Sequence, residues 1–323
     1  MRKIALFLFL LSTVLTSTAC SSRVFSKTEF LLDTVVTIDI YDSADGSVLD
    51  GAFKLCRFYE NMFSRTLPGS EVSRINRHED FELSDDMLEI LTIALEYSRL
   101  TAGAFDITVG AVTPLWNFHS ENPVLPVSSA VTAAIEAVGY EKMAISGNRV
   151  IFTDENTQID LGGIAKGFIG DKITEYLLEN GVTAAVVDLG GNICTVGAKK
   201  NGQPWNIGIQ RPFSDRTELA EKIAVGQKSI VSSGIYERFF VKDGVVYHHL
   251  LNPETGYPVQ NGLASVTVVS DRSVDGDALT TACFVLGPEE GMRLINSLPG
   301  IEALFIFENG ETAFTDDMRD IIQ

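Results

Sequence analysis

An acidic and a hydroxyl side chain four residues apart, Asp277 and Thr281, are the first candidates for chemistry in this sequence. The surrounding residues predict a helix that begins near Val274, and residues four apart on a helix share one face. A carboxylate and a hydroxyl suit Mg²⁺, which takes one or two protein carboxylates and completes its shell with water and phosphate. A structural alternative stays open, because the helix dipole also favours an acid near a helix start and a threonine hydroxyl can bond a backbone carbonyl.

The segment DLGGIAKG, residues 160–167, is the second candidate. It joins a strand predicted over 157–161 to a helix predicted over 164–181. Helix N-termini attract anions, glycines let backbone N–H groups approach a phosphate, and Lys166 adds a cation. The spacing matches neither a Walker A loop nor GxGxxG, and a Gly-Gly corner with a surface lysine is also an ordinary turn. Phosphate binding and a structural corner both remain open for this segment.

The chain has four histidines, of which His248 and His249 are adjacent. Neighbouring side chains of a strand point to opposite faces, so at most one of the two enters a given site. A single histidine is usually structural or solvated. This pair, however, directly precedes the turn Asn252–Gly256, and strand ends are places where sites are commonly built.

The elements that must position these residues mix helices and strands without a strict βαβ rhythm, which favours an α+β fold over a doubly wound sheet. No low-complexity linker divides the chain, so we expect one folded domain. Strands or hairpins are predicted over 29–42, 143–153, 183–191, 204–210, 222–234, 239–252 and around 309–310, and helices over 51–65, 84–103, 128–140, 277–287 and 289–298.

The composition is that of an acidic globular protein. The 323 residues are 45% hydrophobic and 21% charged, with a formal net charge of −18, so the chain can bury a large core. Such a body has no long-range attraction for nucleic acid, which excludes it as a partner. Four cysteines without CxxC spacing predict buried, unpaired thiols and no zinc site.

The first residues predict an export signal. Arg2 and Lys3 precede an apolar run from Ile4 to Leu15 that is too short to span a bilayer, and small residues then lead to Cys20. We expect residues 1–19 to be a lipoprotein signal peptide, residues 20–28 a lipidated cysteine with a short tether, and residues 29–323 the folded domain. An ordinary cleaved signal peptide is the alternative, because Ser17 replaces the usual leucine.

Seven motifs together carry a resemblance to a known family: SEVSRIN, GAFDITVG, DLGGIAKGFIGD, VVDLGGN, SSGIYERFF, HHLLNPETGYPV and DGDALTTACFVLG. In this order, from Glu29 to Asp317, they resemble the ApbE family of FAD:protein FMN transferases. The resemblance implies one α+β domain of two intimately packed sheet-and-helix halves with an FAD cleft between them. It also implies Mg²⁺-dependent cleavage of the FAD pyrophosphate, transfer of FMN to a Ser or Thr hydroxyl of a partner protein, and release of AMP.

The resemblance assigns roles to single residues. Asp277 and Thr281 match the family's metal ligands, Gly163 supplies a backbone carbonyl to the same ion, and His249 matches the histidine that activates the acceptor hydroxyl, with Asp277 as the second catalytic residue. The implied FAD contacts are Leu32, Thr66, Ala104, Phe105, Asp106, Asp160 and Lys166.

Three positions depart from the family pattern. Asn252 stands where Asp is common, Ile235 where Asp or Asn is common, and Thr66 or Leu67 where a tyrosine often stacks on the flavin. Loss of that ring would favour hydrolysis, so an FAD pyrophosphatase and a flavin-binding lipoprotein stay open beside the transferase. A solute-binding lipoprotein unrelated to flavin fits the signal but not the motifs.

The resemblance also implies a place in the cell and a partner. Many members are lipoproteins, so we expect a lipid anchor on the bacterial cytoplasmic membrane, with the domain facing the periplasm or another extracytoplasmic space. The acceptor is expected to be a membrane redox subunit.

Overall fold

A computed structural model describes residues 24–323 apart from 43–44, 119, 121, 200 and 215–217. The predicted signal peptide and Cys20 lie outside the described residues. Strand β1 begins at Phe25, so the last residues of the expected tether already belong to the sheet. In the part of the chain that the structure describes, no helix has the length and apolar character needed to cross a membrane.

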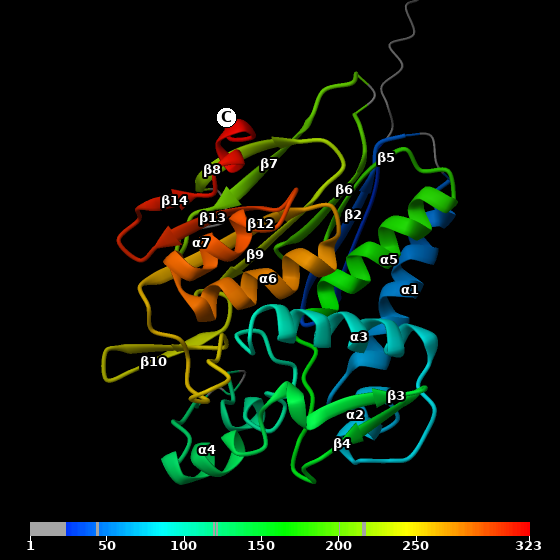
Figure 1. The fold of residues 1–323 in the computed structure, drawn as a ribbon. Coiled ribbons are helices and arrows are strands. Elements are labelled where there is room, and N and C mark those ends of the chain that lie inside the picture. The colour runs from blue at the N-terminus through cyan, green and yellow to red at the C-terminus, as the bar shows by residue number, and fades with distance from the viewer. Residues whose placement is uncertain (1–23, 43–44, 119, 121, 200, 215–217) are drawn as a thin grey trace, which may run out of the picture.

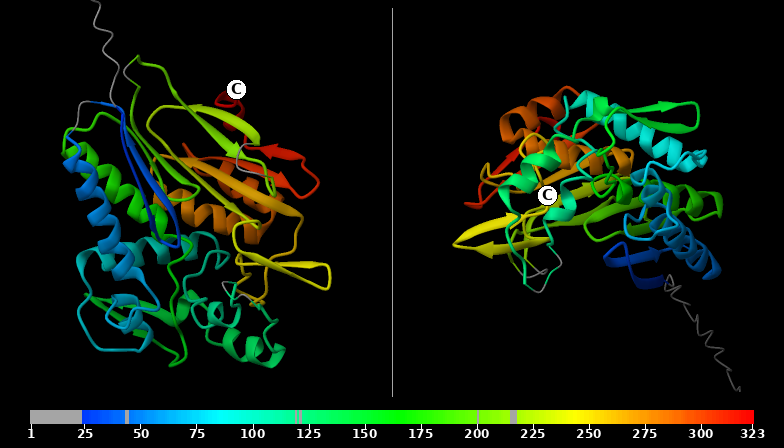
Figure 2. Two further views of the ribbon diagram at one scale, coloured as in Figure 1. Left: turned by 180° about the vertical axis from the view of Figure 1, so that it is seen from behind. Right: turned by 90° about the horizontal axis from the view of Figure 1, so that it is seen from below.

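One eight-stranded antiparallel sheet runs through both halves of the chain, in the order β1-β2-β5-β6-β9-β12-β13-β14. Helices α5, α6 and α7 cover one face (Figure 1), and the view from behind shows the strands in front of them (Figure 2). The strands are β1 (Phe25–Leu31), β2 (Thr34–Ile40), β5 (Ala184–Asp188), β6 (Asn192–Gly197), β9 (Ser229–Gly234), β12 (Leu263–Ser270), β13 (Glu302–Phe307) and β14 (Thr312–Phe314).

The helices and the smaller hairpins complete the fold. The helices are α1 (Ser47–Phe63), α2 (Glu71–Asn76), α3 (Asp85–Leu100), α4 (Ser128–Ile135), α5 (Ala165–Glu179), α6 (Ser273–Leu286) and α7 (Pro288–Asn296). Three two-stranded hairpins pair β3 (Met143–Ser146) with β4 (Arg149–Phe152), β7 (Trp205–Gln210) with β8 (Leu219–Val225), and β10 (Phe239–Lys242) with β11 (Val245–His248).

Strand β12 shows why the layers form. All eight of its residues are buried, because both faces of the sheet are covered at this point. Val266 and Val268 pack with Leu279 and Phe284 of α6, whereas Val269 packs with Ile207 of the β7–β8 hairpin. A continuous apolar run therefore specifies a central strand between a helix layer and a hairpin layer.

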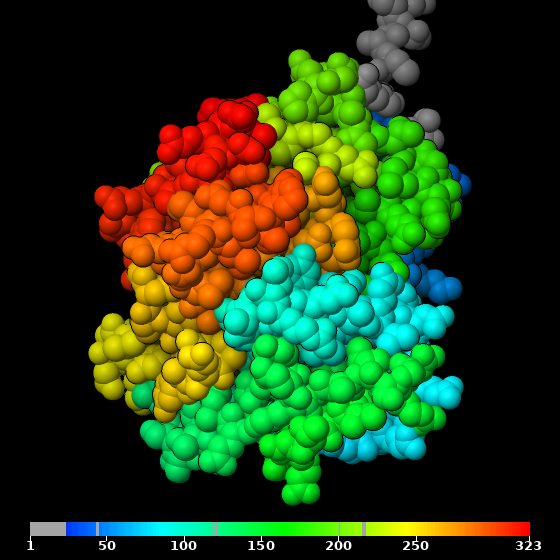
Figure 3. All heavy atoms as spheres, in the orientation of Figure 1, coloured from blue at the N-terminus to red at the C-terminus, as the bar shows by residue number. Residues whose placement is uncertain are grey.

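Helix α3 links the helix layer to the smaller segment that contains β3 and β4. Tyr97 of α3 packs against apolar clusters on both sides, and the space-filling view shows α3 between α6 and the β3–β4 segment (Figure 3).

Two expected elements differ from the structure. The single strand expected over 29–42 is the β1–β2 hairpin, in which Leu32 and Asp33 turn the chain with φ of 56° and 57°. Such left-handed turns are usually marked by Asn-Gly or Asp-Gly, and a leucine rarely adopts this conformation. The sequence Leu-Asp therefore gave no signal for a turn at this place. The strand expected over 157–161 is an extended segment with one parallel bridge, from Gln158 to Val109.

Candidate active site

The site is built where helices α5 and α6 touch. A Cβ atom placed on Gly167 would lie 2.4 Å from the backbone oxygen of Ser273 and 2.8 Å from Asp277 Cβ. Only glycine fits such an approach, so the first turn of α5 lies against the N-terminal half of α6. The close contact brings Asp277 to the beginning of α5.

Asp277 is a buried carboxylate held at the N-terminus of a neighbouring helix. Asp277 is 4% exposed, and its Oδ2 accepts a hydrogen bond of 2.8 Å from the amide of Gly167. Burial raises the pKa of Asp277, while the nearby charge of Lys166 and the amide hydrogen bonds lower it. A cation bound here would relieve the remaining electrostatic penalty.

Thr281 and Gly163 lie beside this carboxylate. The Thr281 hydroxyl donates to the Asp277 carbonyl one turn earlier at 3.4 Å, and a Cβ on Gly163 would lie 3.2 Å from Thr281 Oγ1 and 3.3 Å from the Phe105 ring. The structure thus brings the three predicted metal residues together. Among the described residues no group of three His, Cys, Asp or Glu side chains could hold a metal. One carboxylate, one hydroxyl and one carbonyl instead form a hard oxygen set, which fits Mg²⁺.

Asp160 lies at the start of the turn that ends at Gly163, and both of its carboxylate oxygens accept hydrogen bonds from the protein. Oδ2 accepts hydrogen bonds of 2.8 Å from Arg65 and from Thr113, and Oδ1 accepts one of 2.9 Å from the Gly162 amide. Arg65 was not among the residues predicted from the sequence. Nothing in the loop RTLPGS marks it as a partner of a residue 95 positions away.

The Phe105 ring lies on the other side of the Gly163 turn, and Ala104 and Asp106 flank it in the sequence. All three are buried, and the Asp106 carboxylate accepts hydrogen bonds of 2.8, 2.7 and 2.8 Å from the amide and hydroxyl of Thr108 and the amide of Tyr140. Burial raises the pKa of Asp106 although these bonds lower it. The Asp106 carboxylate is therefore bonded within its own segment and to Tyr140, and the predicted contacts of these three residues with FAD remain predictions.

Lys166, in the first turn of α5, is the cation of the site. Its charge acts on Asp277, on His249 and on Glu237, a residue of the SSGIYERFF motif that the sequence did not single out. Part of the Glu237 side chain is exposed to solvent. The protein packed around its carboxylate nevertheless raises its pKa, although the positive charges of Lys166 and Arg238 lower it. Its place in the SSGIYERFF motif was the one feature of the sequence that could have identified Glu237 as a site residue.

The two adjacent histidines have different environments. His248 is buried, with Nε2 2.7 Å from the Val259 carbonyl and Nδ1 accepting from the Leu250 amide at 3.3 Å, so both ring nitrogens are engaged. The backbone amide of His249 extends the hairpin by donating to Arg238 at 3.1 Å, while its buried Nδ1 has no hydrogen-bond partner among the described residues. Burial lowers the pKa of His249 to about 3, so its ring is neutral at physiological pH.

Leu32 and Thr66 stand apart from this hydrogen-bonded group. Leu32 is at the tip of the β1–β2 hairpin, where its amide donates to Glu60 at 2.6 Å, and Thr66 lies in an exposed loop with its hydroxyl 3.2 Å from Ser64 Oγ. Neither has a hydrogen bond to the residues around Gly163. Their predicted contact with FAD remains a prediction.

The other two departures from the family pattern have structural explanations. Asn252 Oδ1 accepts hydrogen bonds from the amides of Glu254 at 2.8 Å and Thr255 at 3.3 Å, so the amide forms the turn that an aspartate would form. Ile235 is 3% exposed and belongs to the apolar cluster under α6.

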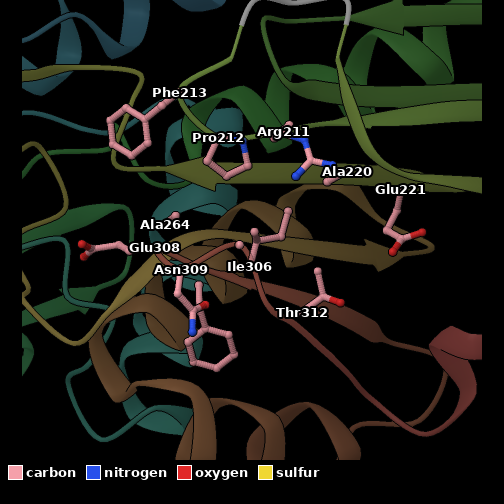
Figure 4. A pocket seen from close by; sticks show the side chains of 12 residues that line it. Arg211, Pro212, Phe213, Ala220, Glu221, Ala264, Ile306, Glu308, Asn309 and Thr312 are labelled. Carbon is pink, nitrogen blue, oxygen red and sulfur yellow. The ribbon is translucent and has the colours of Figure 1, made fainter.

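A hollow of about 380 Å³ lies elsewhere on the molecule (Figure 4). Its lining comes from the segment after β7, from β8 and β12, and from the end of β13 with its turn, including Arg211, Phe213, Ile306 and Glu308. None of the predicted site residues lines it, so it is separate from the group around Asp277.

Comparisons with known proteins agree with this arrangement. The model of the ApbE family matches residues 32–305. A protein of Treponema pallidum (strain Nichols) called FAD:protein FMN transferase is 33% identical over 307 residues, covering 88% of this chain and 85% of the relative. A protein of the same name from Klebsiella pneumoniae (strain 342) is 31% identical over 304 residues, covering 92% and 94%.

Solved structures show the same fold. The ApbE protein of Thermotoga maritima superposes with a TM-score of 0.85 at 30% identity, covering 93% of this chain and 99% of that one. The flavin transferase ApbE from Vibrio cholerae gives 0.83 at 29% identity with the same coverage. The fold and these matches define an enzyme of the transferase class. The chain belongs to the ApbE family, and the α+β fold predicted from the sequence is confirmed.

Proposed function

We propose that this protein is a Mg²⁺-dependent FAD:protein FMN transferase. It cleaves the pyrophosphate of FAD, attaches FMN to a Ser or Thr hydroxyl of a partner protein and releases AMP. The observation that carries the proposal is the convergence of Gly163, Asp277 and Thr281 beside the first turn of α5. The names of the relatives support the flavin chemistry.

Asp277, Thr281 and the Gly163 carbonyl are the residues that would hold Mg²⁺. When bound there, the ion supplies charge neutralisation for the pyrophosphate and for the departing AMP phosphate. The buried Asp277 fits this role because its raised pKa reflects a carboxylate without a complete counter-charge. Lys166 supplies the second positive charge, which an acidic protein needs in order to bind a diphosphate.

His249 is the proposed base. As the acceptor oxygen bonds to the phosphorus of the FMN portion, its hydroxyl proton passes to the imidazole ring of His249, whose buried Nδ1 has no hydrogen-bond partner among the described residues. The bond from that phosphorus to the bridging oxygen breaks, and AMP leaves with that oxygen. Burial keeps the ring neutral before the reaction, so a ring nitrogen can accept this proton, and the negative charge of a bound pyrophosphate beside the ring would raise its pKa and make it a stronger base.

We place the FAD in a cleft between the two halves of the domain, with Leu32, Thr66, Ala104, Phe105, Asp106 and Asp160 near it. The Phe105 ring beside Gly163 supports this orientation. We further propose that the protein is anchored through a lipidated Cys20 to the bacterial cytoplasmic membrane, facing an extracytoplasmic space. A membrane redox subunit is the proposed acceptor, since both proteins would then share one surface.

Cleavage and transfer can be measured together. The full-length chain in detergent is incubated with FAD, with and without Mg²⁺, and with candidate acceptor subunits. FMN and AMP are quantified by chromatography, and covalent flavin is detected by fluorescence on a denaturing gel. Asp277→Ala is the test variant, and Asp271→Ala, an exposed acid paired with Lys228 just before α6, is the matched control.

The proposal predicts Mg²⁺-dependent AMP release with flavin on the acceptor, lost in Asp277→Ala and kept in Asp271→Ala. Release of both FMN and AMP without any labelled protein would instead identify an FAD pyrophosphatase. FAD that stays bound and intact with Mg²⁺ and every acceptor would identify a flavin-binding lipoprotein.

A further inference from the structure

Arg65 connects three segments that are far apart in the sequence. It lies between α1 and α2, and its NH1 group is 2.8 Å from Asp160 Oδ2 and also bonded to the Thr113 hydroxyl, while NH2 donates to the Gly110 carbonyl at 3.0 Å. Its side chain is 25% exposed and that of Asp160 is 19% exposed. One guanidinium therefore bonds both the end of the GAFDITVG segment and the start of the DLGG turn.

The position of Asp160 determines the position of Gly163, because the two residues belong to one hydrogen-bonded turn. Asp160 Oδ1 accepts from the Gly162 amide at 2.9 Å, which closes the turn directly before Gly163. The backbone amide of Asp160 donates to the Ile107 carbonyl at 2.7 Å, so the first residue of the turn is fixed by both its side chain and its backbone.

A second side chain holds the residue before the turn. Asn76, the last residue of α2, donates to the Ile159 carbonyl at 2.9 Å and accepts from the Ile159 amide at 2.7 Å. The same helix holds Arg65, since Ser73 Oγ donates to the Arg65 carbonyl at 2.9 Å. The SEVSRIN motif thus holds both Arg65 and the residue that precedes Asp160. The sequence alone did not assign this role to the motif.

We propose that Arg65 is a positioning residue for the transfer reaction: together with Asp160 it fixes the place of Gly163 beside Thr281 and Asp277. The inference rests on the proposed function, because the reaction it serves is the metal-dependent transfer. A direct bond from Arg65 to the FAD phosphates is the competing role. Both of its terminal nitrogens already bond protein acceptors, which favours positioning.

Lysine cannot replace this arginine, because a single ammonium on a flexible stem does not reproduce a planar group that bonds three acceptors in fixed directions. Arg65→Lys keeps the charge and most of the volume and so tests geometry in particular. Arg77→Lys is the matched control, since Arg77 follows α2, is exposed and pairs only with Glu79 among acidic groups of the described residues.

Two readouts separate positioning from other roles. The first is the Mg²⁺ concentration that gives half-maximal AMP release, which we expect Arg65→Lys to raise about 10-fold, with the rate at saturating Mg²⁺ largely restored. The second needs no turnover: hydrogen exchange in the ligand-free protein should quicken in a peptide covering residues 157–167. Exchange in α7 and both readouts in Arg77→Lys should stay at the wild-type values.

Unchanged exchange over 157–167 and an unchanged Mg²⁺ requirement in Arg65→Lys would overturn the proposal. Weaker FAD binding with unchanged exchange would also overturn it, by showing a direct contact. If the wild type itself shows no metal-dependent turnover, the proposed function fails, and the exchange measurement decides whether Arg65 holds the turn. Asp160→Asn, which removes the charge but keeps the shape, must produce the same exchange pattern.

Discussion

Asp277 Oδ2 lies 2.8 Å from the amide nitrogen of Gly167, so a carboxylate of α6 accepts a hydrogen bond from the first turn of α5. Through this contact Asp277 caps a neighbouring helix. The same carboxylate is also the acidic ligand of the proposed metal site. The two roles have opposite effects on stability, because the cap favours the folded state while the buried charge disfavours it.

Asp277→Asn separates the two roles. The amide oxygen can still accept from Gly167, and the buried charge is gone, so we expect the melting temperature without Mg²⁺ to equal or exceed that of the wild type. Activity should fall by about 100-fold or more, since the ligand is lost. Mg²⁺ with FAD should raise the melting temperature of the wild type but not of the variant. A large drop in melting temperature without Mg²⁺ would contradict this assignment.

Gly163→Ala tests the closeness of the turn to α6. The new Cβ would lie 3.2 Å from Thr281 Oγ1 and 3.3 Å from the Phe105 ring, so one of these groups must shift by a few tenths of an ångström. We expect the Mg²⁺ requirement to rise about 10-fold with little change in folding. Gly226→Ala, where nothing lies within 4 Å of the new Cβ, is the control. Equal Mg²⁺ titrations for both variants would place the metal elsewhere.

Asp171 makes stability depend on pH. Its carboxylate, on α5, accepts hydrogen bonds of 2.6 and 2.9 Å from the amides of Ser273 and Val274 at the beginning of α6, and burial raises its pKa from 3.8 to about 6. The folded state thus holds a proton more tightly than the unfolded state. The contribution of Asp171 is therefore most favourable below about pH 4 and is lost as the pH rises through about 6.

Urea unfolding of the wild type and Asp171→Asn, at intervals from pH 4 to pH 7.5, checks this dependence. The stability of the wild type relative to the variant should fall by about 2 to 3 kcal/mol across that range. A difference that rises with pH, or does not change, would show that the amides and Arg272 compensate the buried charge fully.

The two histidines should respond differently to substitution by Asn. His249→Asn removes the proposed base and should lower the rate of FMN transfer by about 100-fold or more, with the melting temperature unchanged. His248→Asn removes the bond to Val259 and should lower the stability by about 1 to 3 kcal/mol. Rates of transfer and thermal unfolding of both variants decide the matter. The reverse pattern would exchange the roles of the two residues.

The sequence predicted most of the long elements, because helices such as α3 carry their own periodicity and caps. Ser84, for example, accepts from the Met87 amide as the capping pattern predicts. It did not predict the turn at Leu32 and Asp33, since that turn has no local sequence signal and is fixed by tertiary contacts such as the bond from Leu32 to Glu60.

For the site, the motifs identified the residues that contact one another around Asp277, but not those that hold them in place. Arg65 and Asn76 act on residues 95 and 83 positions away, and no local pattern encodes such distances. Asp160 illustrates the limit: its type and place suggested a ligand contact, which stays a prediction, but its bonds to Arg65, Thr113 and Gly162 were not foreseen.

The most direct test of the central claim is the appearance of AMP when the full-length chain in detergent, FAD and a candidate acceptor subunit are mixed with and without Mg²⁺. We predict AMP in equal amount to flavin bound covalently to the acceptor, only with Mg²⁺, and neither product with Asp277→Ala. AMP and acceptor-bound flavin that form equally well without Mg²⁺, or that persist in Asp277→Ala, would contradict the assignment of Gly163, Asp277 and Thr281 as the metal site.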